Sequence, residues 1–236
     1  MSAANPEDSS SGEPALDPEA QEIVRRFHEL YYDTLHNEKS ALSIEWLGVS
    51  AIKCPFDMWT YQEIIHRMRP DVIVETGSGK GGTTYFMACL CELMGNGRVV
   101  SIDYRSPRGP DHPRITYLVG SSVEPDIVEQ VRAAIEPGET VMVILDALHV
   151  EDHVAAELRA YAPLVSVGHY LIVEDTNVNG HPVYPQHGPG PTEAIEGFLQ
   201  EPAGGAFEID RSGERFLLTM NPGGYLRRTR GEQVTG

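Results

Sequence analysis

Two short apolar runs of the sequence each end in side chains that can bind a metal ion or carry a proton. The first run is followed by Asp146 and, three residues further on, by His149. The second run is followed directly by Glu174 and Asp175. If both runs are parallel strands, their carboxyl ends lie at one edge of a sheet, which is where ligands of such sheets bind. The spacing therefore predicts that three carboxylates and one imidazole meet at that edge.

Three carboxylates at one place repel one another, because each negative charge raises the pKa of the others. A bound divalent cation removes this conflict, and ligation by oxygen atoms alone favours Mg²⁺, with Mn²⁺ and Ca²⁺ as lesser options. We therefore expect Asp146, Glu174 and Asp175 to be metal ligands. A metal ion makes a hydroxyl group easier to deprotonate. His149 titrates in the right range to take that proton, so we expect it to be the general base.

Other interpretations of these residues stay open at this point. A carboxylate at the end of a strand often caps the next helix, which would explain any one of the three but explains all of them together less well. Asp146 and His149 could also form an Fe(II) site together with His181 or His187. That site would leave the two carboxylates of the second run without a role.

A glycine-rich turn, Glu75-Thr76-Gly77-Ser78-Gly79-Lys80-Gly81-Gly82, follows another apolar run. Glycines let the backbone turn tightly and approach a ligand closely, and the first N–H groups of the next helix can bind a nucleotide. A P-loop for ATP is excluded because no lysine stands between Gly82 and Thr83. The glycine spacing resembles the turn that binds S-adenosylmethionine (SAM), but it also fits an NAD site or a turn without a ligand.

One acidic residue, Asp103, ends the next apolar run, where a carboxylate can bind the ribose hydroxyls of either SAM or NAD. Together with the turn, this placement predicts a cofactor site at the edge that carries the carboxylates. The residues that we expect to form it are Glu75, Gly77, Ser78, Gly79, Gly81 and Asp103.

The chain as a whole alternates between short apolar runs and helical patterns. Near-continuous Val, Ile and Leu runs predict strands that are buried on both faces, and their alternation with helices predicts an α/β fold with a mainly parallel sheet. We expect strands at 72–74, 99–102, 115–119, 141–145 and 170–173, and two closing strands near Phe207 and at 216–220. We expect helices at 18–36, at 57–68 with Asp57 as N-cap, at 83–94, from Pro125, at 152–161 and at 192–199.

Composition limits the possible partners and the setting. The formal net charge of −17 makes a nucleic-acid partner improbable, because such partners attract Lys and Arg. No apolar run has the roughly 18 residues that span a bilayer, so we expect no membrane segment. The N-terminus lacks the basic start and apolar core of a secretory signal. Three cysteines without metal-site spacing, Cys54, Cys89 and Cys91, are typical of a reduced cytoplasmic protein.

From about Lys53 to Arg228 the chain resembles the cephalosporin hydroxylase/rhamnosyl O-methyltransferase family. The resemblance covers about three-quarters of the sequence. The matching segments are DMWTYQEII at 57–65, VETG at 74–77, LDALH at 145–149, VEDTN at 173–177 and the ending NPGGYLRR at 221–228.

This resemblance implies a Rossmann-like class I SAM-dependent methyltransferase fold with a mostly parallel seven-stranded sheet and helices on both faces. It also implies Mg²⁺ ligands at Asp146, Glu174 and Asp175 and a general base at His149. Family members methylate hydroxyl groups of sugars or antibiotic scaffolds, and several form homo-oligomers. The activity that it implies is O-methylation of a small natural product, with a sugar, a phenol or an antibiotic scaffold as acceptor.

The segment after the second acidic pair, residues 176–191, is rich in Gly and Pro and is too long for a simple connection. We expect a substrate lid that uses Asn177, Asn179, His181 and Tyr184, with a mobile surface loop as the alternative.

Four regions follow from these patterns. They are a disordered arm at 1–16, a helical cap at 17–69, a SAM-binding core at 70–228 and a tail at 229–236. Two other functions stay open: a SAM-binding protein without methyl transfer, and an NAD-dependent oxidoreductase.

Overall fold

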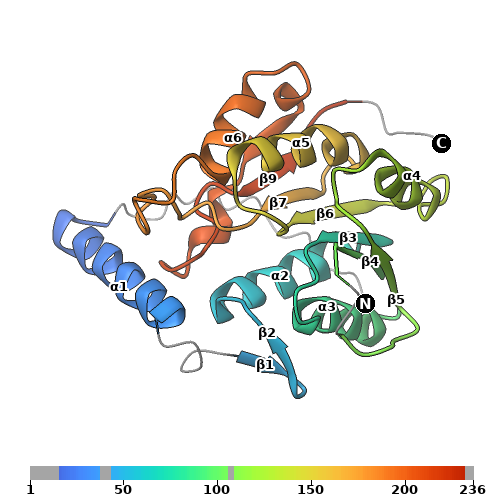
Figure 1. Ribbon diagram of the computed structural model, residues 1–236, viewed down its shortest axis with the longest axis horizontal. Coiled ribbons are helices and arrows are strands. Elements are labelled where there is room, and N and C mark those ends of the chain that lie inside the picture. The colour runs from blue at the N-terminus through green and yellow to red at the C-terminus, as the bar shows by residue number, and fades with distance from the viewer. Residues whose placement is uncertain (1–15, 38–43, 106–108, 232–236) are drawn as a thin grey trace, which may run out of the picture.

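The computed structural model describes residues 16–37, 44–105 and 109–231. Within these residues a seven-stranded sheet has the order β5-β4-β3-β6-β7-β9-β8 (Figure 1). The first five strands in this order are parallel, whereas β9 is antiparallel to both β7 and β8. The predicted mostly parallel seven-stranded sheet is therefore confirmed. Its strands are β3 (Val72–Thr76), β4 (Arg98–Asp103), β5 (Ile115–Val119), β6 (Val141–Leu145), β7 (Tyr170–Val173), β8 (Phe207–Ile209) and β9 (Tyr225–Arg228).

Helices cover both faces of the sheet, as predicted (Figure 1). Alternate residues of a strand point to opposite faces, so Val72 and Val74 join one apolar core while Ile73 joins the other. The core of Val72 contains side chains of α4 (Pro125–Ala133), α5 (Glu151–Tyr161) and α6 (Pro191–Leu199), and the core of Ile73 contains those of α2 (Pro55–Met68) and α3 (Gly82–Met94). The strands between the two cores are apolar on both faces, which explains their continuous apolar runs.

The strand order reverses at β3, which pairs with β4 on one side and with β6 on the other. The chain that leaves β3 and the chain that leaves β6 start side by side, since the N–H of Asp146 donates to the carbonyl of Thr76 at 3.0 Å. A reversal of this kind opens a crevice at the carboxyl edge of a parallel sheet. The glycine-rich turn and Asp146 both lie there.

Two predictions about the chain around α2 are wrong. Cys54 is the N-cap residue of α2, and Asp57 lies inside the helix with a buried carboxylate. That carboxylate accepts hydrogen bonds from the N–H of Met220 at 2.8 Å and from the hydroxyl of Tyr225 at 2.9 Å. Residues 216–220 do not form a strand, and the N–H of Met220 at their end is bonded to α2 in this way, so the closing strand is β9 instead.

Three described elements precede α2 in the chain. The predicted first helix is α1 (Pro18–Asn37), which stands to one side of the sheet in Figure 1. It is followed by a hairpin that the sequence patterns did not predict, β1 (Ile44–Trp46) and β2 (Val49–Ala51). Short 3₁₀ turns are η1 (Ala162–Leu164), η2 (Gly204–Ala206) and η3 (Arg211–Glu214). The arm predicted at 1–16 lies outside the described residues except for Leu16, and so does the tail beyond Gly231.

Among the described helices, none combines the length and the apolar character that crossing a membrane requires. All three cysteines are free thiols.

Candidate active site

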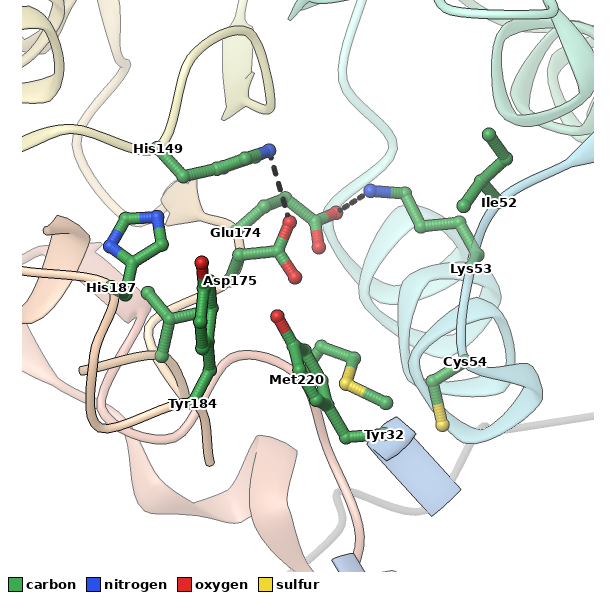
Figure 2. Close-up of a pocket in the computed structure, with 11 residues that line it drawn as sticks. Tyr32, Ile52, Lys53, Cys54, His149, Glu174, Asp175, Tyr184, His187 and Met220 are labelled. Carbon is green, nitrogen blue, oxygen red and sulfur yellow. Dashed lines mark ion pairs between the residues drawn. The ribbon is translucent and has the colours of Figure 1, made fainter. Parts of the chain in front are cut away.

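A pocket of about 360 Å³ opens at the carboxyl edge of the sheet, where β6 and β7 end (Figure 2). Its walls come from α1, from the link between β2 and α2, from the ends of the two strands and from the long loop before α6. The lining residues are Tyr32, Ile52, Lys53, Cys54, His149, Glu174, Asp175, Val178, Tyr184, His187 and Met220. Figure 2 shows that both the acidic pair after β7 and His149 after β6 face this space.

The structure brings Asp146, His149 and Asp175 together. One possible ligand atom from each of these residues lies within 4.8 Å of the other two. The Nε2 atom of His149 is 3.1 Å from Oδ2 of Asp175 and 3.9 Å from Oδ1 of Asp146. Asp175 has a φ of 54°, and its N–H donates to Oδ1 of Asn221 at 3.1 Å. This bond holds the left-handed backbone that turns Asp175 toward the histidine.

Glu174 is the third predicted metal ligand, and its carboxylate is bound by two residues that the sequence patterns did not point to. The side chain of Glu174 is 2% exposed, and its Oε1 atom accepts a hydrogen bond from the hydroxyl of Tyr61. The same atom lies 2.5 Å from Nζ of Lys53, which also contacts Oδ2 of Asp146 at 2.6 Å. Lys53 therefore bridges two of the three carboxylates.

Lys53 is buried, which is rare for a lysine unless it is paired. Burial alone would lower its pKa, but the carboxylates of Asp146, Glu174 and Asp175 raise the pKa of Lys53 above the usual value. The side chain is therefore a fixed ammonium in the wall of the pocket. The only sequence signal for it was its place at the start of the segment that resembles the family.

The glycine turn packs against the end of β6. Gly77 has a φ of +83°, and a β-carbon there would lie 2.0 Å from the carbonyl oxygen of Asp146. No side chain fits in that space, so Gly77 is what lets the turn and the acidic strand end touch. Gly79 has a φ of +56° with nothing within 4 Å of such a carbon, so its surroundings are open. Gly81, with a φ of +83°, is the N-cap residue of α3.

The polar side chains around the turn face inward and support it. Glu75 is buried, and its Oε2 atom accepts hydrogen bonds from Ser101 and Thr84, while its Oε1 atom has no partner among the described residues. Burial raises the pKa of Glu75, although these hydrogen bonds act to lower it. The Oγ atom of Ser78 lies 2.6 Å from that of Ser101. Asp103 accepts from the N–H of Gly79 at 2.9 Å, so it holds the turn beside the end of β4.

One of the four predicted acceptor contacts, Tyr184, lines the pocket. Its ring stacks on that of Tyr32 with centroids 6.4 Å apart and meets His187 edge-on at 5.5 Å. Asn177 is fully buried, and its Nδ2 atom lies 2.9 Å from Nε2 of His28, a residue of α1. It therefore ties α1 to the chain that follows the acidic pair.

The other two predicted contacts, Asn179 and His181, are not among the pocket residues. Both side chains bind Oε1 of Glu193, at 2.8 and 3.1 Å, close to the start of α6. Although partial burial acts to raise it, hydrogen bonds from the Gly190 N–H, Asn179 and His181 lower the pKa of Glu193 to about 2. The long loop is thus fastened to α6 by an ionised carboxylate.

The Fe(II) arrangement of two histidines and one carboxylate is not what the described residues assemble. The side chains that could hold one ion there are the carboxylates of Asp146 and Asp175 and the imidazole of His149. His181 is engaged with Glu193, as above. The site is dominated by carboxylate oxygens, which suits a hard divalent cation.

The sequence of this chain is similar to those of rhamnosyl O-methyltransferases from mycobacteria. A rhamnosyl O-methyltransferase of Mycobacterium tuberculosis is 35% identical over 214 residues, which cover 87% of this chain and 85% of that protein. A rhamnosyl O-methyltransferase of Mycobacterium leprae is 36% identical over 216 residues, which cover 87% of this chain and 90% of that protein.

Solved structures show the same fold. A structure described as "cmcI-D160 Mg-SAM" superposes with a TM-score of 0.63 at 22% identity and covers 81% of this chain and 79% of its own. The MycE methyltransferase from the mycinamycin pathway, in complex with Mg, SAH and mycinamycin VI, superposes with a TM-score of 0.54 at 15% identity. The match covers 73% of this chain and 48% of the MycE chain. The Rossmann-like class I methyltransferase fold implied by the sequence is therefore confirmed.

A family model described as Rhamnosyl O-methyltransferase/CmcI matches residues 38–229, most of the chain. On this match, and on the two mycobacterial relatives, the chain belongs to the Rhamnosyl O-methyltransferase/CmcI family.

Proposed function

We propose that this protein is a SAM-dependent O-methyltransferase that methylates a sugar hydroxyl of a small molecule and needs Mg²⁺ to do so. The observation that carries the proposal is the carboxylate and histidine cluster, which opens into the pocket next to a cofactor-type glycine turn. The names of the curated relatives, rhamnosyl O-methyltransferases, support a sugar as the acceptor.

The glycine turn fits SAM. Gly79 is exposed with open space around it, and Asp103 stands at the end of the adjacent strand, where a ribose would be bound. The buried Oε1 atom of Glu75 has no protein partner among the described residues, so one acceptor under the turn is free for a donor. We assign cofactor binding to the turn from Glu75 to Gly81 and to Asp103.

The carboxylate cluster fits Mg²⁺. Burial raises the pKa of Asp146, although the ammonium of Lys53 acts to lower it. When all three carboxylates are ionised, Lys53 offsets one of their three charges, and the remaining charge of −2 matches a divalent cation. Asp146, Glu174 and Asp175 would hold the ion. Bound there, Mg²⁺ would lower the pKa of the acceptor hydroxyl, and SAM would supply an electrophilic methyl group.

Residues of the chain itself perform the remaining steps. The Nε2–H of His149 can donate to Oδ2 of Asp175, 3.1 Å away, which orients the ring and stabilises the imidazolium that forms. The other ring nitrogen, Nδ1, then carries the lone pair that takes the proton of the acceptor. The rings of Tyr184 and Tyr32 give the pocket an apolar wall that excludes water and can pack against the C–H face of a sugar.

The proposal extends to the setting of the protein. We infer a cytoplasmic homo-oligomer that acts in natural-product biosynthesis, with a helical cap at 17–69 over a SAM-binding core at 70–228. The net charge of −17 supports a small-molecule acceptor rather than a nucleic acid.

The experiment is methyl transfer from labelled SAM to a panel of rhamnosylated acceptors, with Mg²⁺ present or removed by EDTA. We expect product only with the metal, and none from Asp146→Ala, whose SAM affinity should be unchanged. Parallel incubation with NAD monitors the oxidoreductase alternative. Equal turnover in EDTA, or unchanged turnover in Asp146→Ala, would contradict the metal assignment.

A further inference from the structure

The ammonium of Lys53 occupies the place between two carboxylates that the proposed function gives to a metal ion. Its Nζ atom lies 2.5 Å from Oε1 of Glu174 and 2.6 Å from Oδ2 of Asp146. Figure 2 shows the side chain reaching across the pocket wall to Glu174. The side chain is 5% exposed, so little water screens these contacts.

Two cations cannot share these oxygens without repulsion. Mg²⁺ lies at about 2.0–2.1 Å from its oxygen ligands, so an ion on Asp146 and Glu174 would sit within a few ångströms of the ammonium. At that separation like charges repel strongly inside a protein. The ammonium must therefore either leave its two oxygens or weaken the binding of the ion.

In the metal-free protein the same ammonium has a positioning role. Without it, the basic group left among the described contacts of Asp146 and Asp175 is the imidazole of His149, which is charged only when it is protonated. Repulsion among the carboxylates would favour protonation or a displaced strand end. With the ammonium present, two carboxylates are already drawn together in the arrangement that an ion needs.

We propose that Lys53 is a built-in competitor for the divalent cation: it holds Asp146 and Glu174 in place when the metal is absent and lowers the affinity of the site when the metal arrives. This inference rests on the proposed function, since it takes these carboxylates as the metal ligands. It makes Lys53 a positioning residue that sets the metal affinity rather than a group that reacts with the acceptor.

The test is titration of Mg²⁺, and of Mn²⁺ followed by electron paramagnetic resonance, into EDTA-treated full-length protein without SAM. Lys53→Met keeps the length of the side chain and removes the charge, and it should lower the Kd for both ions by roughly tenfold or more. Lys53→Arg keeps the charge and should bind the ions as the wild type does. Arg132→Met removes a positive charge from the exposed side of α4, outside the pocket, and should leave the Kd within about twofold.

Thermal unfolding gives a second readout. Lys53→Met should melt at a lower temperature than the wild type in EDTA, because removal of one partner leaves buried carboxylates unpaired. Saturating Mg²⁺ should raise its melting temperature more than it raises that of the wild type, because tighter binding stabilises more. If Lys53→Met does not fold without metal, Lys53→Gln should shift the Kd in the same direction.

The outcomes separate the two claims. A wild type that binds the ions, with Lys53→Met binding them equally or more weakly, overturns the role of Lys53 and leaves the methyltransferase proposal standing. A wild type and a Lys53→Met variant that both fail to bind any divalent ion overturn both. Tighter binding by Lys53→Met that Asp146→Ala abolishes supports the competition at this site.

Discussion

At the scale of single residues, His149 combines the two properties that a general base needs here. It faces the pocket, and the carboxylate of Asp175 fixes its ring through a contact of 3.1 Å with Nε2. A base must lie within reach of the proton that it removes, and its partner must hold it in one orientation. The same atom is 3.9 Å from Asp146, so the histidine borders the proposed metal position without being enclosed by it.

His149→Ala tests this role. We expect the rate of methyl transfer to fall by roughly 10²–10⁴-fold, the usual contribution of a positioned general base. Affinity for SAM, measured by calorimetry, should not change, because the residue lies on the acceptor side. A loss of less than about tenfold would assign His149 a structural role.

Tyr61→Phe tests the support under Glu174. The hydroxyl of Tyr61 donates to Glu174 and accepts a hydrogen bond from Nδ2 of Asn221 at 3.2 Å, and the ring is fully buried. Removal of a hydrogen bond to a buried charged group costs about 1.5–3 kcal/mol. We expect a loss of that size in the free energy of urea unfolding in EDTA. Tyr104→Phe, at an exposed tyrosine, is the matched control and should change it by less than about 0.5 kcal/mol.

The sequence predicted some site residues and not others for physical reasons. Asp146, His149 and Asp175 could be predicted because parallel strands end at one edge, so spacing after a strand translates into proximity. Lys53 could not be predicted as a site residue, because it lies far from these residues in the sequence. It reaches them only because α2, which follows it, packs against the sheet. The side chains of Asn179 and His181 could not be placed either, since their contact with Glu193 depends on how the long loop closes.

At the scale of elements, the turn between β3 and α3 connects the proposed cofactor site with the carboxylate cluster, because Gly77 packs directly on Asp146. Gly77→Ala would place a methyl group 2.0 Å from the carbonyl oxygen of Asp146, so the turn and β6 would have to separate. Gly79→Ala meets no atom within 4 Å and should cost only about 1–2 kcal/mol for its positive φ.

We therefore expect Gly77→Ala to lower the free energy of unfolding by clearly more than Gly79→Ala and to weaken SAM binding as well. Urea unfolding of both variants checks the first point. Equal losses would show that the close approach between Gly77 and Asp146 is not the reason for that glycine.

Helix α1 is held partly through His28, which is buried against Asn177. Burial lowers the pKa of His28 from 6.5 to about 4. The unfolded chain therefore binds a proton between these values while the folded chain does not, so stability falls as the pH drops from about 6.5 toward 4.

His28→Gln should reduce the difference in unfolding free energy between pH 7.5 and pH 5, whereas His66→Gln, at an exposed position, should not. Both are measured by urea unfolding at the two pH values. An unaltered pH dependence in His28→Gln would show that this histidine is already accessible to protons in the folded protein.

Elements with continuous apolar runs were predicted within a few residues, because a strand buried on both faces has no other pattern. The hairpin of β1 and β2 has only three residues in each strand, too few for a period to emerge. Strand β9 contains two charged residues, Arg227 and Arg228, whereas residues 216–220 are mostly apolar, so the sequence pattern favoured a strand at 216–220. The N–H of Met220 instead donates to Asp57 of α2, a contact between distant parts of the chain.

At the scale of the whole molecule, the arrangement explains why the methyltransferase chemistry belongs at this edge. The sheet reverses its strand order between β3 and β6, so the glycine turn and the carboxylates lie next to each other. Helix α1 and the long loop add Tyr32 and Tyr184 to the pocket wall that we propose for the acceptor. Alternation of strands and helices predicted the α/β class with a mainly parallel sheet, whereas the class I methyltransferase fold was implied by the family resemblance, and the strand order came only with the structure.

Calorimetric titration of SAM and then Mg²⁺ into the EDTA-treated protein, with NAD as a control, tests the central claim most directly. The account predicts that SAM binds, that NAD does not, and that Mg²⁺ binding is lost in Asp146→Ala while SAM binding remains. Binding of NAD without binding of SAM would contradict the account and make the glycine turn part of an oxidoreductase.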